Sequence, residues 1–344
     1  VAAVAHAHGV PLVIDNTVAS PYLCNPCDWG ADIVVHSATK YIGGHGTTMG
    51  GVVVEGGKFP WDNGKFPEMV EPSRAYHGVK FYETFGDFGY TMKARMEVNR
   101  TFGGVLSPMN AWQLLQGAET LHLRMREHCR NALAVAKFLQ SHPQVAWVNY
   151  PGLADSPYYD LAQKQFRAVD GAPGASGILT FGVKGGAAAG EKFIDACEFL
   201  SHLANIGDAK TLVIHPASTT HRQLNEEELA RAGVSADMVR LSVGIENVSD
   251  IIADIEQALQ KSIINPAATA NGETDLLLVL RKYNSHQKPG FTTIESLPEN
   301  SIFQTENGKV FKKGNQRRKR YICVELKTGL QYLFSPIAEV KIIE

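Results

Sequence analysis

Two short apolar runs near the start of the chain, each leading into polar residues, constrain the fold more than any other feature. The first is Val10–Ile14, which ends at Asp15, and the second is Ile33–Val35, which leads into Ser37 and Lys40. Runs this short and this apolar are typical of strands buried on both faces of a mostly parallel sheet. The sequence therefore predicts that the chain begins in an α/β fold.

The next part of the chain alternates between helical and strand-like segments. Ser107 followed by Pro108 is a good N-terminal cap, and an apolar face continues from there, so we expect one long helix that stops at Pro143. Strands are expected at Val145–Val148, Ile178–Val183 and Met238–Val243, and helices near Glu191–Leu200, Glu226–Ala232 and Asp250–Leu259. This alternation predicts a partial large domain over 1–106 and a smaller α/β domain over 107–262.

The character of the chain changes near Ser262. Residues 263–344 hold 12 Lys and Arg against 8 Asp and Glu, whereas the residues before them hold 21 against 27. Residues 263–272 are small, polar and contain proline, as expected of a linker. The runs KVFKKG, RYICVEL and QYLFSP that follow have β-type composition. We therefore expect a separate, basic, β-rich module over 273–344.

The overall composition excludes several classes of protein. The chain has 344 residues and a net charge of −2, which argues against a dedicated nucleic-acid-binding protein. No apolar run approaches the roughly 18 residues of a membrane-spanning helix, and no signal peptide opens the chain. Five scattered cysteines are more typical of a reducing compartment than of a disulfide framework, so we expect a cytoplasmic location.

Asp15 and Lys40 follow neighbouring strands, at the sheet edge where open α/β sheets bind ligands. A lysine amine forms a Schiff base with an aldehyde, and a carboxylate pairs with a pyridinium nitrogen, which together suit pyridoxal 5′-phosphate (PLP). The hydroxyls of Ser37 and Thr39 beside the lysine would donate to its phosphate. Taken singly, a strand-end aspartate is commonly a turn residue and such a lysine is usually solvated, so only the combination predicts a PLP site.

Longer segments around these residues resemble a known family. The segment DNTVASPYLCNPCDWGADIVVHSATKYIGGHG is similar to the cofactor segment of the Cys/Met-metabolism PLP-dependent enzymes, which have fold-type I. The similarity continues through LQGAETLHLRMREHCRNA and VRLSVGIEN and covers residues 1 to about 261. Within the family, GGHGT and LANIGDAKTLVIHPASTTH are most similar to the O-acetylhomoserine sulfhydrylases.

The resemblance implies a role for each residue that matches the family's motifs. Lys40 would be the Schiff-base lysine that also moves the substrate proton, Asp15 the partner of the pyridine nitrogen, and Ser37 and Thr39 phosphate ligands. Arg240 would hold the α-carboxylate of the amino-acid substrate, a role that suits a guanidinium fork. The last assignment is Asn205, which would assist the same carboxylate.

The activity implied is γ-replacement in methionine biosynthesis, in which O-acetylhomoserine and sulfide or methanethiol give homocysteine or methionine and acetate. Cystathionine γ-synthase and γ-lyase type relatives share Lys40, Asp15 and Arg240, so they remain alternatives. The family's N-terminal part, with its phosphate loop, its stacking ring and residues that reach a partner subunit, has no counterpart here. We therefore expect the chain as given to be an inactive fragment of a homodimer or homotetramer.

Other motifs have ordinary explanations. Cys24 and Cys27 have CxxC spacing, but no second pair completes a zinc site, and the histidines lack metal-ligand spacing. The basic run QRRKR near the end would contact nucleic acid or form a solvated hairpin turn. Its surroundings faintly resemble the C-terminal end of SprT-like proteins, without an HExxH helix. A non-catalytic binding protein with a nucleic-acid-contacting tail is therefore the alternative from another class.

Overall fold

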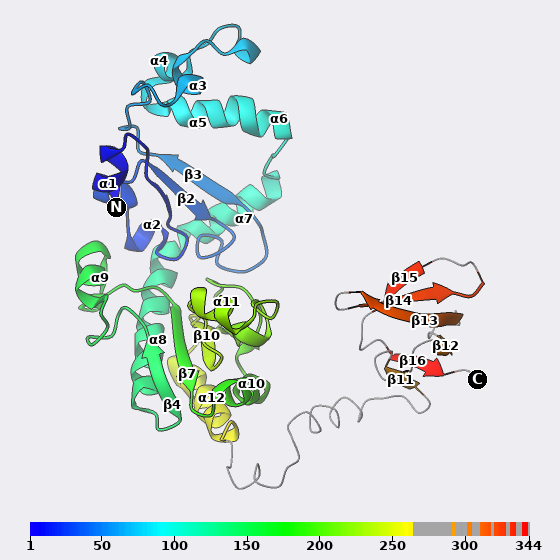
Figure 1. Ribbon diagram of the computed structural model, residues 1–344. Helices are drawn as coiled ribbons and strands as arrows, with labels where there is room; N and C mark the ends of the chain where they lie inside the picture. The colour runs from blue at the N-terminus through cyan, green and yellow to red at the C-terminus, as the bar shows by residue number, and fades with distance from the viewer. Residues whose placement is uncertain are drawn as a thin grey trace. The chain divides into compact units, whose positions relative to one another are not determined.

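The computed structural model describes residues 1–263 and, beyond them, residues 291–293, 297, 301–304, 310–317, 320–327, 331–334 and 339–342. The chain divides into two compact units, Val1–Ile264 and Asn265–Glu344 (Figure 1). The expected linker over 263–272 lies outside the described residues, apart from Ile263. Among the described residues, no helix is long and apolar enough to cross a membrane.

The first unit opens with a three-stranded sheet in the order β1-β2-β3. The strands are β1 (Val13–Asp15), β2 (Ile33–Ser37) and β3 (Gly51–Glu55). The parallel pairing of β1 with β2 confirms the predicted α/β start, although β1 begins later than the apolar run. The prediction of a mostly parallel sheet is wrong for β3, which pairs antiparallel with β2. The connection between β2 and β3 is a loop over residues 38–50 that contains Lys40 and no crossover helix, so the chain returns in the opposite direction.

Short helices surround this sheet and cover one end of it with aromatic rings. Trp61 stacks on Tyr90 at 5.5 Å between ring centroids and meets Phe66 edge to face at 5.1 Å. Before the sheet's last strand lie α1 (Ala2–Ala7), α2 (Ser20–Leu23) and η1 (Pro26–Trp29). After it come α3 (Pro67–Val70), η2 (Arg74–Tyr76), α4 (Phe81–Phe85), η3 (Gly86–Phe88), α5 (Gly89–Lys93), the π-helix η4 (Ala94–Asn99) and α6 (Arg100–Phe102).

The predicted single long helix is wrong, because two helices occupy its place. Ser107 caps α7 (Pro108–Glu119) as expected, with its hydroxyl accepting from the Asn110 amide. The helix ends at Thr120, and α8 (Leu121–Ser141) follows directly. The Thr120 hydroxyl donates to the Gly117 carbonyl at 3.3 Å, and this side-chain bond replaces regular helical pairing at the break.

A second sheet, of five strands, forms the core of the unit's C-terminal part. Its order is β4-β7-β10-β9-β8, and only β8 and β9 run parallel. The strands are β4 (Val145–Asn149), β7 (Ile178–Val183), β8 (Ser201–His202), β9 (Leu212–Ile214) and β10 (Met238–Ser242). The other elements of this part are α9 (Tyr159–Gln165), β5 (Ala168–Val169), β6 (Ala172–Pro173), α10 (Gly186–Ala196), η5 (Pro216–Ser218), α11 (Glu226–Arg231) and α12 (Val248–Lys261). Three strands and three helices of this part therefore match the predicted ones, while β8 and β9 were not predicted.

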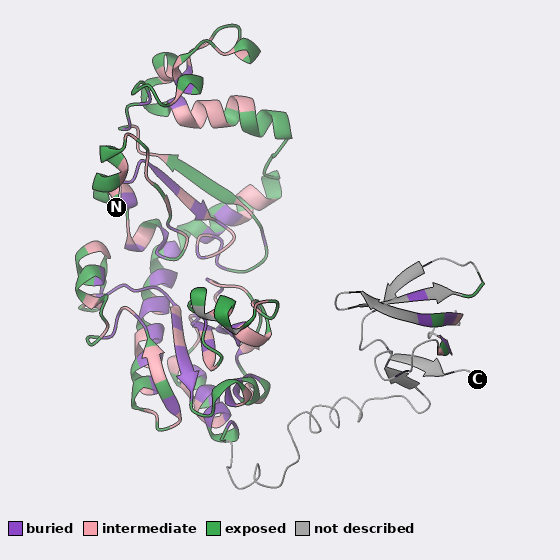
Figure 2. Ribbon diagram, viewed as in Figure 1, coloured by how far each residue is buried: buried purple, intermediate pink, exposed green. Residues whose placement is uncertain are grey.

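One face of this second sheet is packed under α8, α10 and α12. Phe181 of β7 meets Phe193 of α10 edge to face at 5.4 Å, and both side chains are fully buried. Much of β7 is coloured as buried in Figure 2. Leu241 of β10 points into the same core. Because side chains alternate along a strand, Arg240 is directed to the opposite face. The alternation of side chains along β10 therefore places Arg240 on the face of the sheet away from the hydrophobic core.

The second unit contains a six-stranded sheet in the order β11-β16-β12-β13-β14-β15. Three of its strands, β13, β14 and β15, confirm the predicted β-type runs, and β13 and β14 pair antiparallel as a hairpin would. Phe303 and Phe311 stack at 5.8 Å, and Lys313 is buried with its amine donating to the Leu297 carbonyl. The strands are β11 (Phe291–Thr293), β12 (Ile302–Gln304), β13 (Val310–Arg317), β14 (Arg320–Glu325), β15 (Gln331–Phe334) and β16 (Glu339–Ile342).

Candidate active site

Asp15 is the last residue of β1, and its carboxylate is held by the residue two positions later. Its Oδ1 accepts from the Thr17 hydroxyl at 2.5 Å and from the Thr17 amide at 2.9 Å. These hydrogen bonds favour the charged form and hold the pKa of Asp15 below its ordinary value. Burial lowers the pKa of the neighbouring His36, which is therefore neutral at pH 7. Asp15 thus keeps its negative charge, and His36 does not neutralise it.

Lys40 lies in the turn that follows β2. Its amide donates to the Ser37 carbonyl at 3.1 Å, and its carbonyl accepts from the Gly44 amide at 2.7 Å. Its ε-amine donates to the side-chain oxygen of Asn205, which belongs to the loop between β8 and β9. The structure therefore brings Lys40 and Asn205 together from positions 165 residues apart.

The two predicted phosphate ligands differ in how their hydroxyls are used. The Thr39 hydroxyl donates to the Gly50 carbonyl at 3.3 Å and accepts from the Gly50 amide at 3.1 Å. The Ser37 backbone amide donates to the Thr17 hydroxyl at 2.7 Å, which ties the ends of β1 and β2 together. Because the bonds to Gly50 occupy Thr39, the hydroxyl of Ser37 is the more open donor of the two.

Arg240 presents a half-buried positive charge beside Asn205. Its guanidinium donates to the Asn205 backbone carbonyl at 3.4 Å, and no other hydrogen bond or ion pair of this side chain is found within the described residues. Burial lowers the pKa of Arg240, but the ordinary pKa of arginine is so high that the group stays charged. A desolvated guanidinium with open donors is well suited to a carboxylate.

Together these groups form a donor set that fits PLP and an amino acid. The carboxylate of Asp15 is ionised and has one oxygen without a hydrogen bond inside the described residues, as a pyridinium partner needs. Lys40 supplies a primary amine held by a neutral amide, and Ser37 supplies a hydroxyl. Within the described part of the chain, no cluster of three His, Cys, Asp or Glu side chains is placed to bind a metal ion.

Sequence reasoning missed two contacts that shape this site. Thr17 holds the Asp15 carboxylate, and the spacing Asp-x-Thr is a turn signal that would have indicated it. The contact between Asn205 and Lys40 had no local signal, because residues so far apart are brought together only by the fold.

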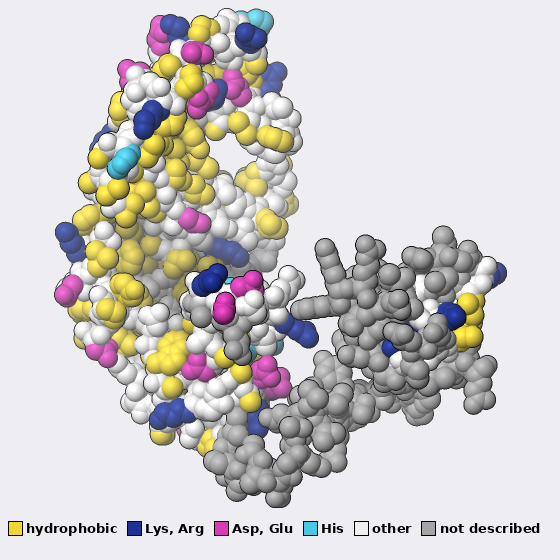
Figure 3. All heavy atoms as spheres, in the orientation of Figure 1, with side chains coloured by type: hydrophobic (Ala, Val, Ile, Leu, Met, Phe, Trp, Pro, Cys, Tyr) yellow, Lys and Arg dark blue, Asp and Glu magenta, His cyan; other side chains and the backbone are white. Residues whose placement is uncertain are grey.

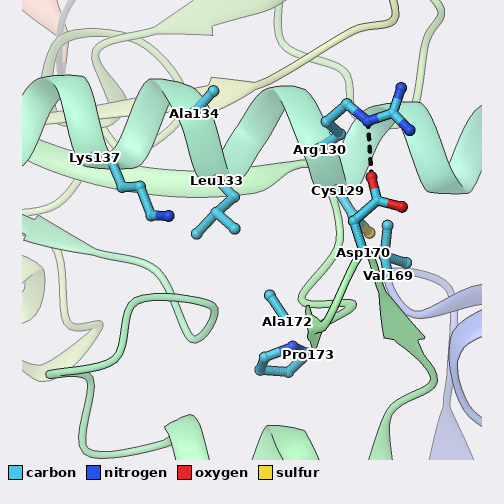
Figure 4. Close-up of a pocket in the computed structure, with 9 residues that line it drawn as sticks. All are labelled: Cys129, Arg130, Leu133, Ala134, Lys137, Val169, Asp170, Ala172 and Pro173. Carbon is cyan, nitrogen blue, oxygen red and sulfur yellow. Dashed lines mark hydrogen bonds and ion pairs between the residues drawn. The ribbon is translucent and has the colours of Figure 1, made fainter.

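Two pockets of the first unit lie near the candidate site, and neither includes Lys40. The larger one, of about 680 Å³, reaches Asp15 and is otherwise mostly apolar, in the region of α1 and α2 where Figure 3 shows hydrophobic side chains. The smaller one, of about 200 Å³, lies between α8 and the β5–β6 hairpin, where Arg130 pairs with Asp170 at 2.9 Å (Figure 4).

Comparison with known proteins decides between the possible families. A sequence profile of the Cys/Met metabolism PLP-dependent enzymes matches residues 1–260. The chain belongs to this family. The enzymes of this family depend on PLP. The donor groups of Asp15 and Lys40 described above fit this cofactor.

Curated relatives and a solved structure give the same result. The chain is 54% identical over 269 residues to an O-acetyl-L-homoserine sulfhydrylase of Leptospira meyeri and 51% identical over 256 residues to O-acetyl-L-homoserine sulfhydrylase 1 of Thermus thermophilus. These matches cover 76% and 74% of this chain, which spans about 60% of the length of each relative.

One of the similar solved structures is described as an O-acetylhomoserine (thiol)-lyase of Campylobacter jejuni, and it contains N′-pyridoxyl-lysine-5′-monophosphate. It is 40% identical, with a TM-score of 0.70 over 75% of this chain and 61% of that one. The α/β architecture of the first unit is therefore that of a PLP-dependent thiol-lyase.

Proposed function

We propose that this chain contributes the lysine-bearing part of an O-acetylhomoserine sulfhydrylase. The substrate would be O-acetylhomoserine, the second reactant sulfide or methanethiol, and the products acetate with homocysteine or methionine. The observation that carries the proposal is the contact of Asn205 with both Lys40 and Arg240, beside the tied strand ends that carry Asp15 and Ser37, in a family member whose curated relatives have this activity.

Each residue has a role that follows from its surroundings. When bound, PLP supplies an aldehyde for an amine and a ring that accepts electrons from a broken C–H bond. Lys40 would attach the cofactor and, once released by the substrate, move a proton at its ε-nitrogen. Asp15, kept ionised by Thr17, would hold the proton on the ring nitrogen. Ser37 and Thr39 would donate to the phosphate, Ser37 more readily because its hydroxyl is open.

The substrate end of the site is formed by the other sheet. Arg240 would bind the α-carboxylate through its open donors. Asn205 contacts both Lys40 and Arg240, so its amide would orient the lysine while its backbone lies beside the carboxylate site. We propose accordingly that residues 1–106 bind the cofactor, that 107–262 bind the substrate, and that 263–272 link both to a basic module over 273–344.

Exposed apolar side chains support a homodimer or homotetramer. Five of them lie between the end of α6 and the end of α7 with more than half of their surface exposed: Phe102, Val105, Met109, Trp112 and Leu115. A contiguous apolar stretch of this kind usually meets another protein surface. The cysteines Cys24, Cys27, Cys129 and Cys197 are free thiols, which supports a reducing compartment such as the cytoplasm.

The experiment uses the full-length product of the gene that encodes these residues, loaded with PLP. Acetate release from O-acetylhomoserine is measured with sulfide, with methanethiol and without a thiol. We expect release that depends on the thiol and yields homocysteine or methionine. Preferential cleavage of cystathionine or of methionine would instead assign a γ-lyase reaction, and formation of cystathionine with cysteine as the thiol would assign the γ-synthase reaction. No turnover of any of these substrates would contradict the proposal.

A further inference from the structure

Arg124 is a buried arginine whose charge is satisfied without a carboxylate. It lies in the first turn of α8, and only 5% of its surface is exposed. Its four hydrogen bonds in the described part of the chain all go to uncharged oxygens. Removing a guanidinium from water is costly, and burial lowers the pKa of Arg124. Because burying this charge is costly, we infer that its hydrogen bonds fix a particular arrangement of the groups that accept them.

Three of the four bonds reach backbone carbonyls, and two of these belong to the turn directly after Lys40. Nη1 donates to the Tyr41 carbonyl at 2.6 Å, and Nη2 donates to the Ile42 carbonyl at 3.1 Å. Nη2 also donates to the Gly117 carbonyl at 2.6 Å, and Nε donates to the Thr120 hydroxyl at 3.1 Å. The guanidinium therefore ties the α7–α8 junction to the two residues that follow Lys40.

The packing around these bonds leaves no room for side chains. A Cβ on Gly44 would lie 2.2 Å from Nη1 of Arg124, and Gly44 has a φ of +73°. A Cβ on Gly117 would lie 2.5 Å from the carbonyl oxygens of Ile42 and Gly43. Both glycines allow the guanidinium and α7 to approach the backbone of the turn closely.

The opposite side of the same turn is held by the loop that carries Asn205. The Ala209 amide donates to the Gly44 carbonyl at 2.9 Å, and Gly207 lies against the Tyr41 backbone. The ε-amine of Lys40 donates to Asn205 in this loop. The turn is thus fixed between Arg124 on one side and residues 205–209 on the other.

We propose that Arg124 is a positioning residue, which fixes the turn after Lys40 so that the ε-amine stays in place for the cofactor. The inference rests on the proposed role of Lys40. An arginine is needed because its planar fork donates in several fixed directions at once, whereas a lysine donates from a single nitrogen. Methionine fills similar space and donates to nothing.

Amide hydrogen exchange in the full-length protein tests the geometry without the cofactor. In Arg124→Met, we expect the amides of Gly43 and Gly44 to exchange about ten-fold faster, because the bonds that fix their turn are lost. Arg124→Lys should give an intermediate rate. Arg126→Met is the matched control, since Arg126 is a half-exposed neighbour on α8 whose one ion pair among the described residues is with Asp170.

Cofactor attachment supplies the second readout. The rate at which added PLP becomes fixed to Lys40, trapped by borohydride at timed intervals, should fall about ten-fold in Arg124→Met, with partial rescue in Arg124→Lys. Leu139→Ala, at a fully buried position near the other end of α8, controls for loss of stability and should leave that rate unchanged.

Each outcome separates the two hypotheses. Unchanged exchange at Gly43 and Gly44, or a rise spread evenly over the first unit, would overturn the positioning role. An equal loss of trapping in Leu139→Ala would do the same. If the unmodified protein does not attach PLP at Lys40, the proposed function fails, and the exchange rates alone decide whether Arg124 fixes the turn.

Discussion

The two sheets of the first unit differ in how they are supported. The five-stranded sheet is packed under three helices, and Phe181, Leu241 and their neighbours are fully buried. The three-stranded sheet has exposed valines along β3, of which Val53 is 48% exposed, and among the described residues β1 pairs only with β2. Figure 2 shows β3 as an exposed strand. Yet Asp15 ends a strand of this less buried sheet, and Lys40 lies in the turn that follows β2.

We infer from this difference that the proposed chemistry and the stability of this unit depend on different parts of it. Lys40 is held by side chains and loops from outside its own sheet, namely Asn205 from the β8–β9 loop and Arg124 from α8. The well-packed part therefore serves as the support against which the reactive lysine is placed. The predictions below test this separation.

The largest expected effect is on turnover after Lys40→Ala. Loss of the amine that attaches the cofactor and moves the proton should lower kcat by roughly 10³-fold or more. The melting temperature should change little, because Lys40 is outside the packed core. Steady-state kinetics and thermal unfolding of the same preparation measure kcat and the melting temperature. A melting temperature that falls as far as in a core variant would contradict the proposed separation of chemistry from stability.

Phe181→Ala should produce the opposite pattern. The side chain is fully buried between β7 and α10, so its removal should cost about 3–5 kcal/mol of unfolding free energy. Val53→Ala is the matched change on the other sheet and should cost less than about 1 kcal/mol, because Val53 is half exposed. Denaturant titrations of both variants measure these costs, and similar losses would contradict the account.

Asp15→Asn should reduce turnover on the order of 100-fold while the cofactor stays attached. An amide cannot balance the charge on a protonated ring nitrogen, so the electron sink weakens. Thr17→Ser retains the hydroxyl that holds Asp15 and serves as the control. Turnover by Asp15→Asn within a few-fold of the original would show that Asp15 is not the ring partner.

Asp254 in α12 offers a smaller, pH-dependent test within the well-packed part. Burial raises its pKa, but amide bonds from Glu198, Phe199 and Leu200 and a bond from Gln257 outweigh burial and lower it overall. A depressed pKa means that the stabilisation is present above the ordinary value of 3.8 and is lost as the pH falls through the folded-state pKa.

Asp254→Asn should therefore cost about 1–3 kcal/mol of unfolding free energy at pH 7 and progressively less below pH 3.8. Urea titrations of both proteins across this range measure the difference. A difference that grows as the pH falls would show that the sign of the pKa shift is wrong.

The sequence predicted those features that depend on neighbours along the chain. Apolar runs located β1, β2, β4, β7 and β10, and the cap at Ser107 located the start of α7. Asp15 at the end of its strand and Lys40 in the following turn were also predicted correctly, since strand ends and turns have local signals.

Features that depend on distant contacts were not predictable. At the helix break, the Thr120 hydroxyl accepts a hydrogen bond from Arg124. The other partners of Arg124 include Tyr41 and Ile42, which lie more than 80 residues away along the chain. The strands β8 and β9 are too short for a clear pattern of alternation and form because β10 pairs beside them. Asn205 reaches Lys40 for the same reason, since its loop follows β8.

The most direct test of the account is to identify the lysine that carries the cofactor. The full-length gene product is incubated with PLP, reduced with borohydride and digested, and the labelled peptide is identified by mass spectrometry. The account predicts a single label at Lys40, which disappears in Lys40→Ala while the fold is retained. A label on another lysine, or labelling that persists in Lys40→Ala, would contradict it.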